Sequence, residues 1–277
     1  MSNKFFSRNG KILPITDATI PLKNMEYAYG FGVYETIRVR NGIVYFTNQH
    51  IKRLLQSAII LGITHQFTEK AIEKYIYDLL KTEKVNTCNI KILLIGAKTK
   101  QESLLFILSL SPLFPKRKFY TEGVKTISFQ YERQFPKAKT LNMLGSYLAY
   151  KKALEQECYD ALFTDYNGNI LEGTRTNFFT IKDKTIFTPP EDKILGGITK
   201  ETVLYVAKKQ GFKIKELNIS PVKLSQYDGA FLTTTIAKIL PIKQIDDFIF
   251  SEISNQIKML MQKYDDFLEV SKGIFKS

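Results

Sequence analysis

The sequence predicts a mixed α and β fold made of two subdomains, the second of which is rich in antiparallel strands. The hydrophobic pattern switches repeatedly between the two-residue alternation of strands and the three-to-four-residue spacing of helices. Asn-Gly pairs, which favour tight hairpins, occur at Asn41-Gly42 and at Asn167-Gly168. Prolines and basic residues cluster between Ser111 and Lys118, a composition typical of a boundary between compact units.

Composition places the chain among ordinary globular proteins. Its 277 residues, 44% of them hydrophobic and 24% charged, can bury one large core or two smaller ones. Cys88 and Cys158 stand far apart, so we expect neither a disulfide framework nor a thiolate zinc site. The N-terminus lacks a signal-peptide core and no apolar run approaches about 20 residues. We therefore expect a cytoplasmic protein without a membrane partner.

The formal net charge of +13 suits a nucleic-acid partner, an anionic substrate or only a basic surface. The basic residues are scattered through every segment, and no zinc-finger or RNP-like motif accompanies them. We therefore favour a solvated basic surface and expect no nucleic acid as a partner.

The first subdomain, residues 1–115, is expected to combine a sheet with two helices. Strands at residues 33–39 and 42–46 meet at Asn41-Gly42. A helical pattern then runs from Asn48 to Gly62, and a second one covers residues 69–80. The apolar runs at residues 90–95 and 104–110 predict buried strands.

A connecting segment is expected at residues 116–130, followed by a larger C-terminal subdomain at residues 131–277. The elements predicted in this subdomain are a helix at residues 144–157, a hairpin at Asn167-Gly168, a turn at Asp183-Lys184, a helix after Gly197 and a strand at residues 230–235.

Several common kinds of site are missing from the sequence. Its two histidines, His50 and His65, stand in no metal-binding spacing, so no metal is expected. Gly30-Phe-Gly32 is not the dinucleotide fingerprint, and no Walker phosphate loop occurs. A nicotinamide enzyme or a P-loop ATPase is therefore not expected.

Four groups of segments do point to one chemistry. In order they are Tyr29–Arg38 with His50–Leu54, Lys139–Asn142, Leu171–Phe178, and Gly197–Thr199 with Thr233–Thr235. Together they resemble the class IV aminotransferase family, that is, the fold-type IV pyridoxal-phosphate enzymes with branched-chain aminotransferases, D-amino-acid aminotransferases and aminodeoxychorismate lyase. The resemblance implies pyridoxal 5'-phosphate as the cofactor, amino-acid and 2-oxo-acid substrates, and a homodimer.

The resemblance assigns the Schiff-base lysine to Lys139, because the family carries it in a Lys-x-Leu-Asn segment before a long helix. Lys137 is the near rival. A lysine in this role must lose its proton to attack the aldehyde and must later move the substrate's α proton. Burial beside cationic groups favours that neutral amine.

The resemblance also places Glu172 beside the pyridine nitrogen, where a carboxylate keeps the nitrogen protonated so that the ring can accept electrons. Asn177 follows it, as in many members of the family. Taken outside the motif, Glu172 would more often be a solvated surface residue.

The phosphate of the cofactor is assigned to donors in three further segments. Arg53 matches the family's phosphate arginine, although it could be only a helix-surface residue. Ile198 and Thr199 stand where a helix begins and its amides attract anions, unless Thr199 is only a cap. Thr234 and Thr235 supply further donors, or simply favour a strand.

The substrate pocket is assigned less fully. Tyr34 and Arg38 lie on a strand that resembles the pocket wall of the family, although Tyr34 could be a core aromatic and Arg38 the cross-strand partner of a carboxylate. D-amino-acid enzymes bind the substrate carboxylate with an Arg and His pair, which the stretch Gly96–Lys100 lacks. Lys98 or Lys100 could replace that pair, but exposed loop lysines seldom do so.

Three functions remain open. Leu144 replaces the tyrosine that branched-chain enzymes carry after the catalytic lysine. We favour an aminotransferase for branched-chain or other apolar amino acids, because two segments, Tyr34–Arg38 and Glu172–Asn177, resemble that branch. Aminodeoxychorismate lyase, which serves 4-aminobenzoate and folate synthesis, is the alternative, and a non-catalytic basic nucleic-acid-binding protein is the distant one.

Overall fold

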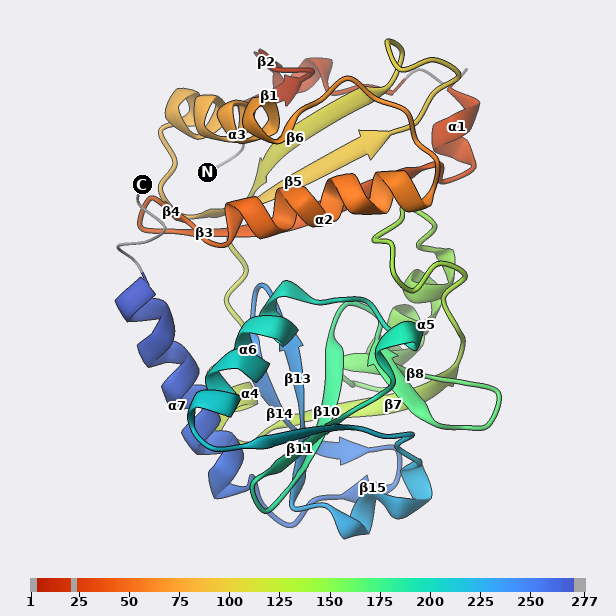
Figure 1. The fold of residues 1–277 in the computed structure, drawn as a ribbon, viewed down its shortest axis with the longest axis vertical. Helices are drawn as coiled ribbons and strands as arrows, with labels where there is room; N and C mark the ends of the chain where they lie inside the picture. Colours follow the sequence, from red (N-terminus) through yellow and green to blue (C-terminus); the bar gives the residue numbers. More distant parts are fainter. Residues whose placement is uncertain (1–3, 21–23, 272–277) are drawn as a thin grey trace. The chain divides into compact units, whose positions relative to one another are not determined.

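The structure is a computed structural model that describes residues 4–20 and 24–271. The chain forms two compact units. The first contains the chain up to Leu113 and a short later segment, Ala138–Met143, and the second contains Phe114–Lys137 and Leu144–Ser271. Both combine helices and strands (Figure 1), which agrees with the predicted mixed class.

The first unit is built on a six-stranded antiparallel sheet in the order β2-β1-β6-β5-β3-β4. The strands are β1 (Phe5–Arg8), β2 (Lys11–Pro14), β3 (Gly32–Arg40), β4 (Ile43–Val44), β5 (Cys88–Ile95) and β6 (Leu104–Leu110). The helices are α1 (Met25–Ala28), α2 (Thr47–Ile60) and α3 (Glu69–Glu83), and a 3-10 turn covers Ile15–Asp17.

Helices α2 and α3 cover one face of this sheet, where the apolar stripe of α2 packs against alternate residues of β3, β5 and β6. The expected hairpin between β3 and β4 is confirmed: Asn41 and Gly42 both have positive φ, 52° and 77°, as a tight two-residue turn requires. Helix α3 runs to Glu83, three residues past the prediction, and ends where Lys84 adopts a left-handed conformation. Strands β1 and β2 had not been predicted.

The segment Ala138–Met143 is attached to the edge of β3. The Tyr34 amide donates to the Lys139 carbonyl at 2.9 Å, and the Leu141 amide donates to the Gly32 carbonyl at 2.8 Å. Position 32 favours glycine because a Cβ there would lie 2.9 Å from the backbone carbonyl oxygen of Leu94, besides its contact with the Leu141 side chain. Backbone pairing thus fixes the candidate lysine against the first unit.

The second unit contains a nine-stranded sheet in the order β12-β11-β10-β13-β14-β7-β8-β9, with β15 beside β14. The strands are β7 (Val124–Gln130), β8 (Asp160–Thr164), β9 (Ile170–Gly173), β10 (Asn177–Lys182), β11 (Thr185–Thr188), β12 (Lys213–Glu216), β13 (Gly229–Thr234), β14 (Lys238–Ile245) and β15 (Phe248–Ile249). The helices are α4 (Lys118–Thr121), α5 (Leu144–Glu155), α6 (Ile198–Lys209) and α7 (Asn255–Val270), with 3-10 turns at Glu191–Lys193 and Pro221–Gln226.

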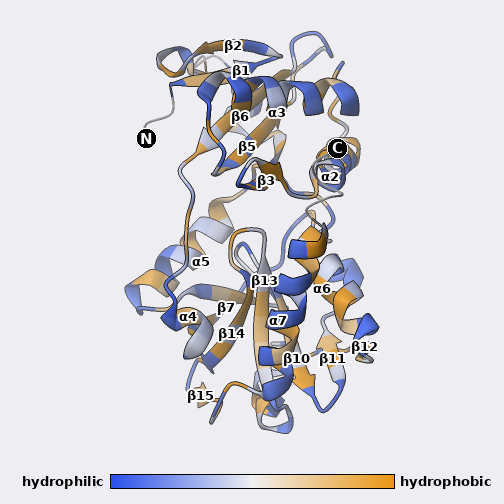
Figure 2. Ribbon diagram, turned by 90° about the vertical axis from the view of Figure 1, so that its left-hand side faces the viewer, coloured by the Kyte–Doolittle hydropathy of each residue, from blue (hydrophilic) through white to orange (hydrophobic). Residues whose placement is uncertain are grey.

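Most pairings in this sheet are antiparallel, as predicted; β7 pairs in parallel with both β8 and β14, and β11 with β12. Strand β9 also pairs with β10, through Asn177 and Glu172, so six strands from β10 through β13, β14, β7 and β8 to β9 close into a ring. In the first unit, apolar residues dominate β5 and β6 (Figure 2).

The division of the chain differs from the predicted one in two respects. Residues 116–130 are not a connecting segment, because they form α4 and β7, and β7 lies inside the sheet between β14 and β8. Lys139 belongs to the first unit and not to the larger C-terminal one, because its segment pairs with β3. Prolines mark the chain's exit from the first unit, but composition carries no signal for this return.

Among the described helices, none is both long and apolar enough to cross a bilayer.

Candidate active site

The predicted site residues fall into two groups, one in each unit. Tyr34, Arg38, Arg53 and Lys139 belong to the first unit. Glu172, Asn177, Ile198, Thr199, Thr234 and Thr235 belong to the second.

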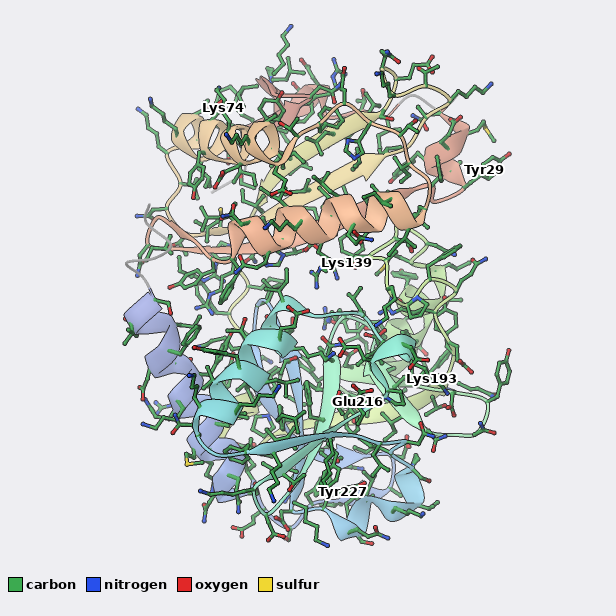
Figure 3. The ribbon with its side chains drawn as sticks, in the orientation of Figure 1. Tyr29, Lys74, Lys139, Lys193, Glu216 and Tyr227 are labelled. Atoms are coloured by element: carbon green, nitrogen blue, oxygen red, sulfur yellow. The ribbon has the colours of Figure 1, made fainter. Side chains whose placement is uncertain are left out.

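Lys139 is half-buried against β3 and α2 (Figure 3). Its amide donates to the Ser57 hydroxyl of α2 at 3.1 Å, and its Nζ lies 4.6 Å from the centre of the Tyr34 ring. Lys137 differs: its side chain is exposed, belongs to the second unit and donates to the Glu191 carbonyl. Of the two rival lysines, Lys139 therefore has the sheltered position that an amine nucleophile needs.

Arg53 is held by a fully buried carboxylate on β3. Its Nε and Nη2 donate to the two oxygens of Glu35 at 2.6 and 2.8 Å. His50 Nδ1 lies 2.7 Å from Glu35 Oε2, and because a carboxylate only accepts, Nδ1 carries the proton. The side chain of Arg53 is thus fixed in place and is not a loose surface residue, whatever anion it binds.

The pKa values of this trio follow from burial and charge. Burial alone would raise the pKa of Glu35, but Arg53 and His50 outweigh it and hold that pKa well below its usual range. Burial lowers the pKa of His50 despite the adjacent carboxylate, so the imidazole is neutral at pH 7. The trio at pH 7 is therefore one cation, one anion and a neutral hydrogen-bond donor.

Tyr34 is buried, with 8% of its surface exposed, and two lysines flank its ring. Besides Lys139, the Nζ of Lys91 on β5 lies 3.5 Å from the ring centre. Tyr34 is thus a buried aromatic residue with two lysine side chains at its ring.

Arg38 lies 5.4 Å over the Tyr45 ring and has a buried Nε for which the described residues provide no partner. Its cross-strand neighbour is Asn89, so the alternative that Arg38 pairs with a carboxylate across the sheet is wrong.

Glu172 is buried, with 3% exposure, so the alternative of a solvated surface residue is wrong. Arg133 Nε donates to its Oε1 at 2.7 Å. Its Oε2 accepts from the Leu195 amide at 3.2 Å and weakly from Asn177 Nδ2 at 3.4 Å. Oε1 is thus paired with Arg133, whereas Oε2 accepts only longer hydrogen bonds. Oε2 is therefore better placed to accept a hydrogen bond from a further donor.

The residues between Glu172 and Asn177 build the turn that brings them together. Thr174 and Thr176 donate their hydroxyls to Asp160 at 2.6 and 2.9 Å. A Cβ at Gly173 would collide with the Thr176 hydroxyl. Burial raises the pKa of Asp160 although these donors oppose the shift. Thr174 and Thr176 therefore stabilise the turn, and Glu172 and Asn177 at its two ends are the candidate cofactor contacts.

Helix α6 begins in a way that suits an anion. Gly197 is its N-cap and provides no side-chain hydrogen bond, so the amides that open the helix keep the positive end of the helix dipole. Ile198 and Thr199 are buried there. A Cβ at Gly197 would collide with Asn177 Oδ1, so glycine also ties the helix start to Asn177.

The three threonines at the end of β13 have different surroundings. Thr233 faces Asn177 across the sheet, is 2% exposed, and has a hydroxyl without a partner among the residues described. Thr234 and Thr235 are partly exposed where β13 turns toward β14. Glu172, Asn177 and Thr233 therefore lie side by side on three adjacent strands.

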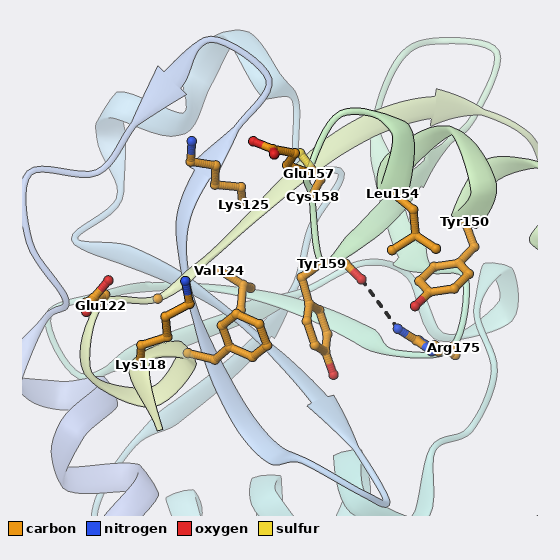
Figure 4. A pocket seen from close by; sticks show the side chains of 12 residues that line it. Lys118, Glu122, Val124, Lys125, Tyr150, Leu154, Glu157, Cys158, Tyr159 and Arg175 are labelled. Atoms are coloured by element: carbon orange, nitrogen blue, oxygen red, sulfur yellow. Dashed lines mark hydrogen bonds between the residues drawn. The ribbon is translucent and has the colours of Figure 1, made fainter. Parts of the chain in front are cut away.

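A pocket of about 380 Å³ lies elsewhere in the second unit, against α4, β7 and α5 (Figure 4). Arg175 reaches into it and donates to the Tyr159 carbonyl at 3.5 Å, with its guanidinium 4.0 Å from the Tyr150 ring. None of the predicted cofactor residues is among those that line it. Arg175, although part of the Leu171–Phe178 segment, therefore points away from Glu172's partners.

Four residues of these groups had not been predicted: Glu35, Lys91, Arg133 and Thr233. Lys91 had a visible signal, because it is the single charged residue in a mainly apolar strand. Arg133 carried none, since it stands in an irregular stretch. Within residues 4–20 and 24–271, no cluster of His, Cys, Asp and Glu is arranged to hold a metal ion.

Comparison with known proteins gives one consistent result. The family described as amino-transferase class IV matches residues 32–245. A D-alanine aminotransferase of Listeria innocua is 28% identical over 86% of both chains. A putative branched-chain-amino-acid aminotransferase of Methanocaldococcus jannaschii is 28% identical over 93% of this chain and 94% of its own.

Solved structures agree in fold. The Escherichia coli branched-chain amino acid aminotransferase superposes with a TM-score of 0.87 at 23% identity, over 94% of this chain and 93% of that one. A branched-chain aminotransferase of Thermoproteus uzoniensis, solved with norvaline, gives 0.86 at 24% identity, over 98% and 96%.

Proposed function

The chain belongs to the amino-transferase class IV family and is a pyridoxal-5'-phosphate-dependent aminotransferase, and from this premise we propose the roles of its residues and the class of its substrates. The named relatives are aminotransferases, so amino transfer is favoured over the lyase reaction and over nucleic-acid binding. In amino transfer one amino acid leaves as a 2-oxo acid, and a second 2-oxo acid receives the amino group.

The residues present fit this cofactor. A phosphate needs amide and hydroxyl donors, which the uncapped start of α6 and Thr199 offer. A protonated pyridine nitrogen needs a carboxylate, which Glu172 offers with an oxygen that has only long contacts. The Thr233 hydroxyl beside Asn177 has no partner within residues 4–20 and 24–271, and a ligand can satisfy a buried group of this kind.

Lys139 is proposed as the residue that holds the cofactor's aldehyde carbon. When bound, pyridoxal 5'-phosphate supplies that aldehyde and a ring that accepts electrons. The Lys139 amine is proposed to act as the base that takes the substrate's α proton and, once protonated, as the acid that gives this proton up elsewhere. Its half-buried place over Tyr34 is the observation that carries this assignment.

Glu172 is proposed to hold the proton on the pyridine nitrogen, with Arg133 and Asn177 fixing the carboxylate. Arg53, Ile198, Thr199, Thr234 and Thr235 are proposed to bind the phosphate. Arg53 would do so from the orientation that Glu35 imposes, because two of its nitrogens already belong to that carboxylate. Tyr34 and Arg38 are proposed to line the substrate pocket.

The substrate is proposed to be a small apolar amino acid. Relatives that match over most of their length are named for D-alanine or for branched-chain amino acids, so the chirality is the first property to measure. A homodimer in the cytoplasm is proposed on the same family grounds.

The test is the half-reaction of the purified, cofactor-loaded protein with single amino acids. We expect L-leucine, L-valine or D-alanine to convert the bound cofactor to its amine form, which the loss of the visible absorption band reports, with one equivalent of 2-oxo acid formed. Lys139→Ala should abolish this conversion, whereas Lys137→Ala should retain it. If no amino acid reacts while aminodeoxychorismate yields pyruvate, the proposed substrate class is wrong.

A further inference from the structure

The pocket of about 380 Å³ in the second unit has largely aromatic and apolar walls (Figure 4). All the residues that line it lie between Lys118 and Arg175 in that unit. The rings of Phe119 and Tyr159 meet at 73° with their centres 5.5 Å apart, so they form a corner. Leu154 also lines the pocket and keeps 53% of its surface exposed. A pocket with this volume and these walls is typical of small-molecule sites.

Arg175 lines this pocket with most of its donors unused. Two tyrosine rings hold its guanidinium, whose central carbon lies 4.0 Å from the centre of the Tyr150 ring and 5.6 Å from that of Tyr159. In the described part of the chain its N–H groups have one acceptor, the Tyr159 carbonyl at 3.5 Å, and no carboxylate forms an ion pair with it. The charge of Arg175 also acts on Asp160, but both oxygens of that buried carboxylate already accept hydroxyl groups of the turn at residues 172–177. Aromatic contacts thus orient Arg175 and leave it able to bind an anion.

The charges around the pocket favour an anionic ligand. Three cations line it, Lys118, Lys125 and Arg175, against two carboxylates, Glu122 and Glu157. Within residues 4–20 and 24–271, no ion pair involves any of these five side chains. The lining therefore has an excess of positive charge that no internal pair neutralises, and an anion would balance it.

We propose that this pocket binds a flat aromatic molecule with one anionic group, which Arg175 holds while Phe119 and Tyr159 contact the ring. The planar guanidinium presents parallel N–H groups, a geometry that fits two oxygens of a carboxylate or a phosphate. A ring placed in the corner of Phe119 and Tyr159 stacks on one of them and meets the edge of the other. Burial raises the pKa of Tyr159 to about 12, so its hydroxyl stays protonated at neutral pH and is a further donor. The site is separate from amino transfer, because none of the proposed cofactor or substrate contacts lines it.

The test measures ligand binding to the cofactor-loaded full chain by calorimetry. The probes are 2-naphthoate, 2-naphthyl phosphate and the neutral 2-naphthamide, which keep the ring and vary the group that meets Arg175. We expect the anionic probes to bind more tightly than the amide. Arg175→Met should weaken binding of the better anionic probe at least tenfold, because charge-assisted hydrogen bonds are lost, and should change binding of the amide little. Arg175→Lys, which keeps the charge but not the planar group, should fall between Arg175→Met and the wild type.

Two variants of helix α5 show whether the probe occupies this pocket. Leu154→Asp puts a carboxylate into the pocket at an exposed position, so the fold should be kept and binding of the anionic probes should be lost. Leu148 is 49% exposed on the same helix and does not line the pocket. Leu148→Asp is therefore the matched control, and it should bind all three probes like the wild type.

Each outcome supports or overturns the proposal. Whichever anionic probe binds more tightly identifies the anion as a carboxylate or a phosphate ester, and both results support the proposal when Arg175→Met and Leu154→Asp weaken that binding. Anionic probes that bind no better than the amide overturn it, as does anion binding that survives in Arg175→Met or in Leu154→Asp, or an equal loss in Leu148→Asp. Amino transfer is measured independently, so a protein that transaminates no amino acid but passes this test loses the proposed function and keeps the pocket ligand.

Discussion

Arg133 and Glu172 form a largely buried ion pair in the second unit, in which Nε of the guanidinium lies 2.7 Å from carboxylate Oε1. The same guanidinium donates to the Thr174 carbonyl at 3.0 Å and to the Ser146 hydroxyl at 3.3 Å. Arg133 thus ties Glu172 to the turn that follows it and to helix α5. A carboxylate held in this way has a fixed direction, which is what a partner for a pyridine nitrogen requires.

Removing Arg133 should destabilise the fold through Glu172. Arg133→Met leaves the Glu172 carboxylate, which is 3% exposed, without its cationic partner. We therefore expect the free energy of unfolding, measured with urea, to fall by about 3 kcal/mol. The double variant with Glu172→Gln should recover more than half of that loss, because no buried charge then remains. If the losses of the two single variants simply add, the pair is not coupled and the positioning role of Arg133 is wrong.

Acid should weaken the Arg53–Glu35 pair. The pKa of Glu35 is held below its ordinary value of 4.5, so its contribution to stability is complete above pH 4.5 and disappears as the pH falls toward the folded-state pKa. In Glu35→Gln this contribution is absent at every pH. The free energy of unfolding, measured with urea from pH 6 to pH 2.5, should therefore decline less in the variant than in the wild type. The exposed Glu252→Gln is the control and should decline like the wild type.

Glu35→Gln should also weaken cofactor binding, because Arg53 would lose the charge that orients it. We expect the dissociation constant of pyridoxal 5'-phosphate to rise about tenfold, the effect of losing about 1.4 kcal/mol. Inorganic phosphate, which competes for the same donors, should lose affinity in parallel. Unchanged affinity for both ligands would mean that Arg53 does not bind the phosphate.

Lys91 should make the cofactor-free protein less stable near neutral pH. Its pKa falls from 10.5 to about 8 on folding, so the unfolded chain binds more protons between these values and stability rises with pH across that window. The free energy of unfolding of Lys91→Met at pH 7 should therefore be higher than that of the wild type by at most about 3 kcal/mol. This difference should shrink between pH 8 and pH 10.5. A difference that stays constant with pH would mean that Lys91 is not a desolvated cation.

Local patterns predicted much of the fold. The hairpin at Asn41-Gly42 and the start of α6 after Gly197 depend on neighbouring residues, and both were predicted correctly. The return of Ala138–Met143 to β3 depends on backbone pairing between residues about a hundred positions apart, so no local pattern reveals it. The strand β7 was missed for a different reason: the prolines before it indicated a linker.

The site residues that stand in a family motif could be predicted. The residues that hold them in place could not, because they lie in other parts of the sequence. Lys139, Glu172 and Asn177 stand in segments with a family pattern. Their supports do not: Arg133 reaches Glu172 across 39 positions, and Glu35 meets Arg53 across 18. Thr233 was given no role, because its place opposite Asn177 follows from the register between β13 and β10. Such partners emerge only when the sheet register is known.

The most direct test of the account is to locate the lysine that carries the cofactor. The loaded protein is treated with borohydride, which fixes the carbon–nitrogen bond, and is then digested with trypsin and mapped by mass spectrometry. We predict that the pyridoxyl group is found on Lys139, in a peptide that starts at Ala138 and is not cut after residue 139. Labelling of Lys137, of another lysine, or of none would contradict the account.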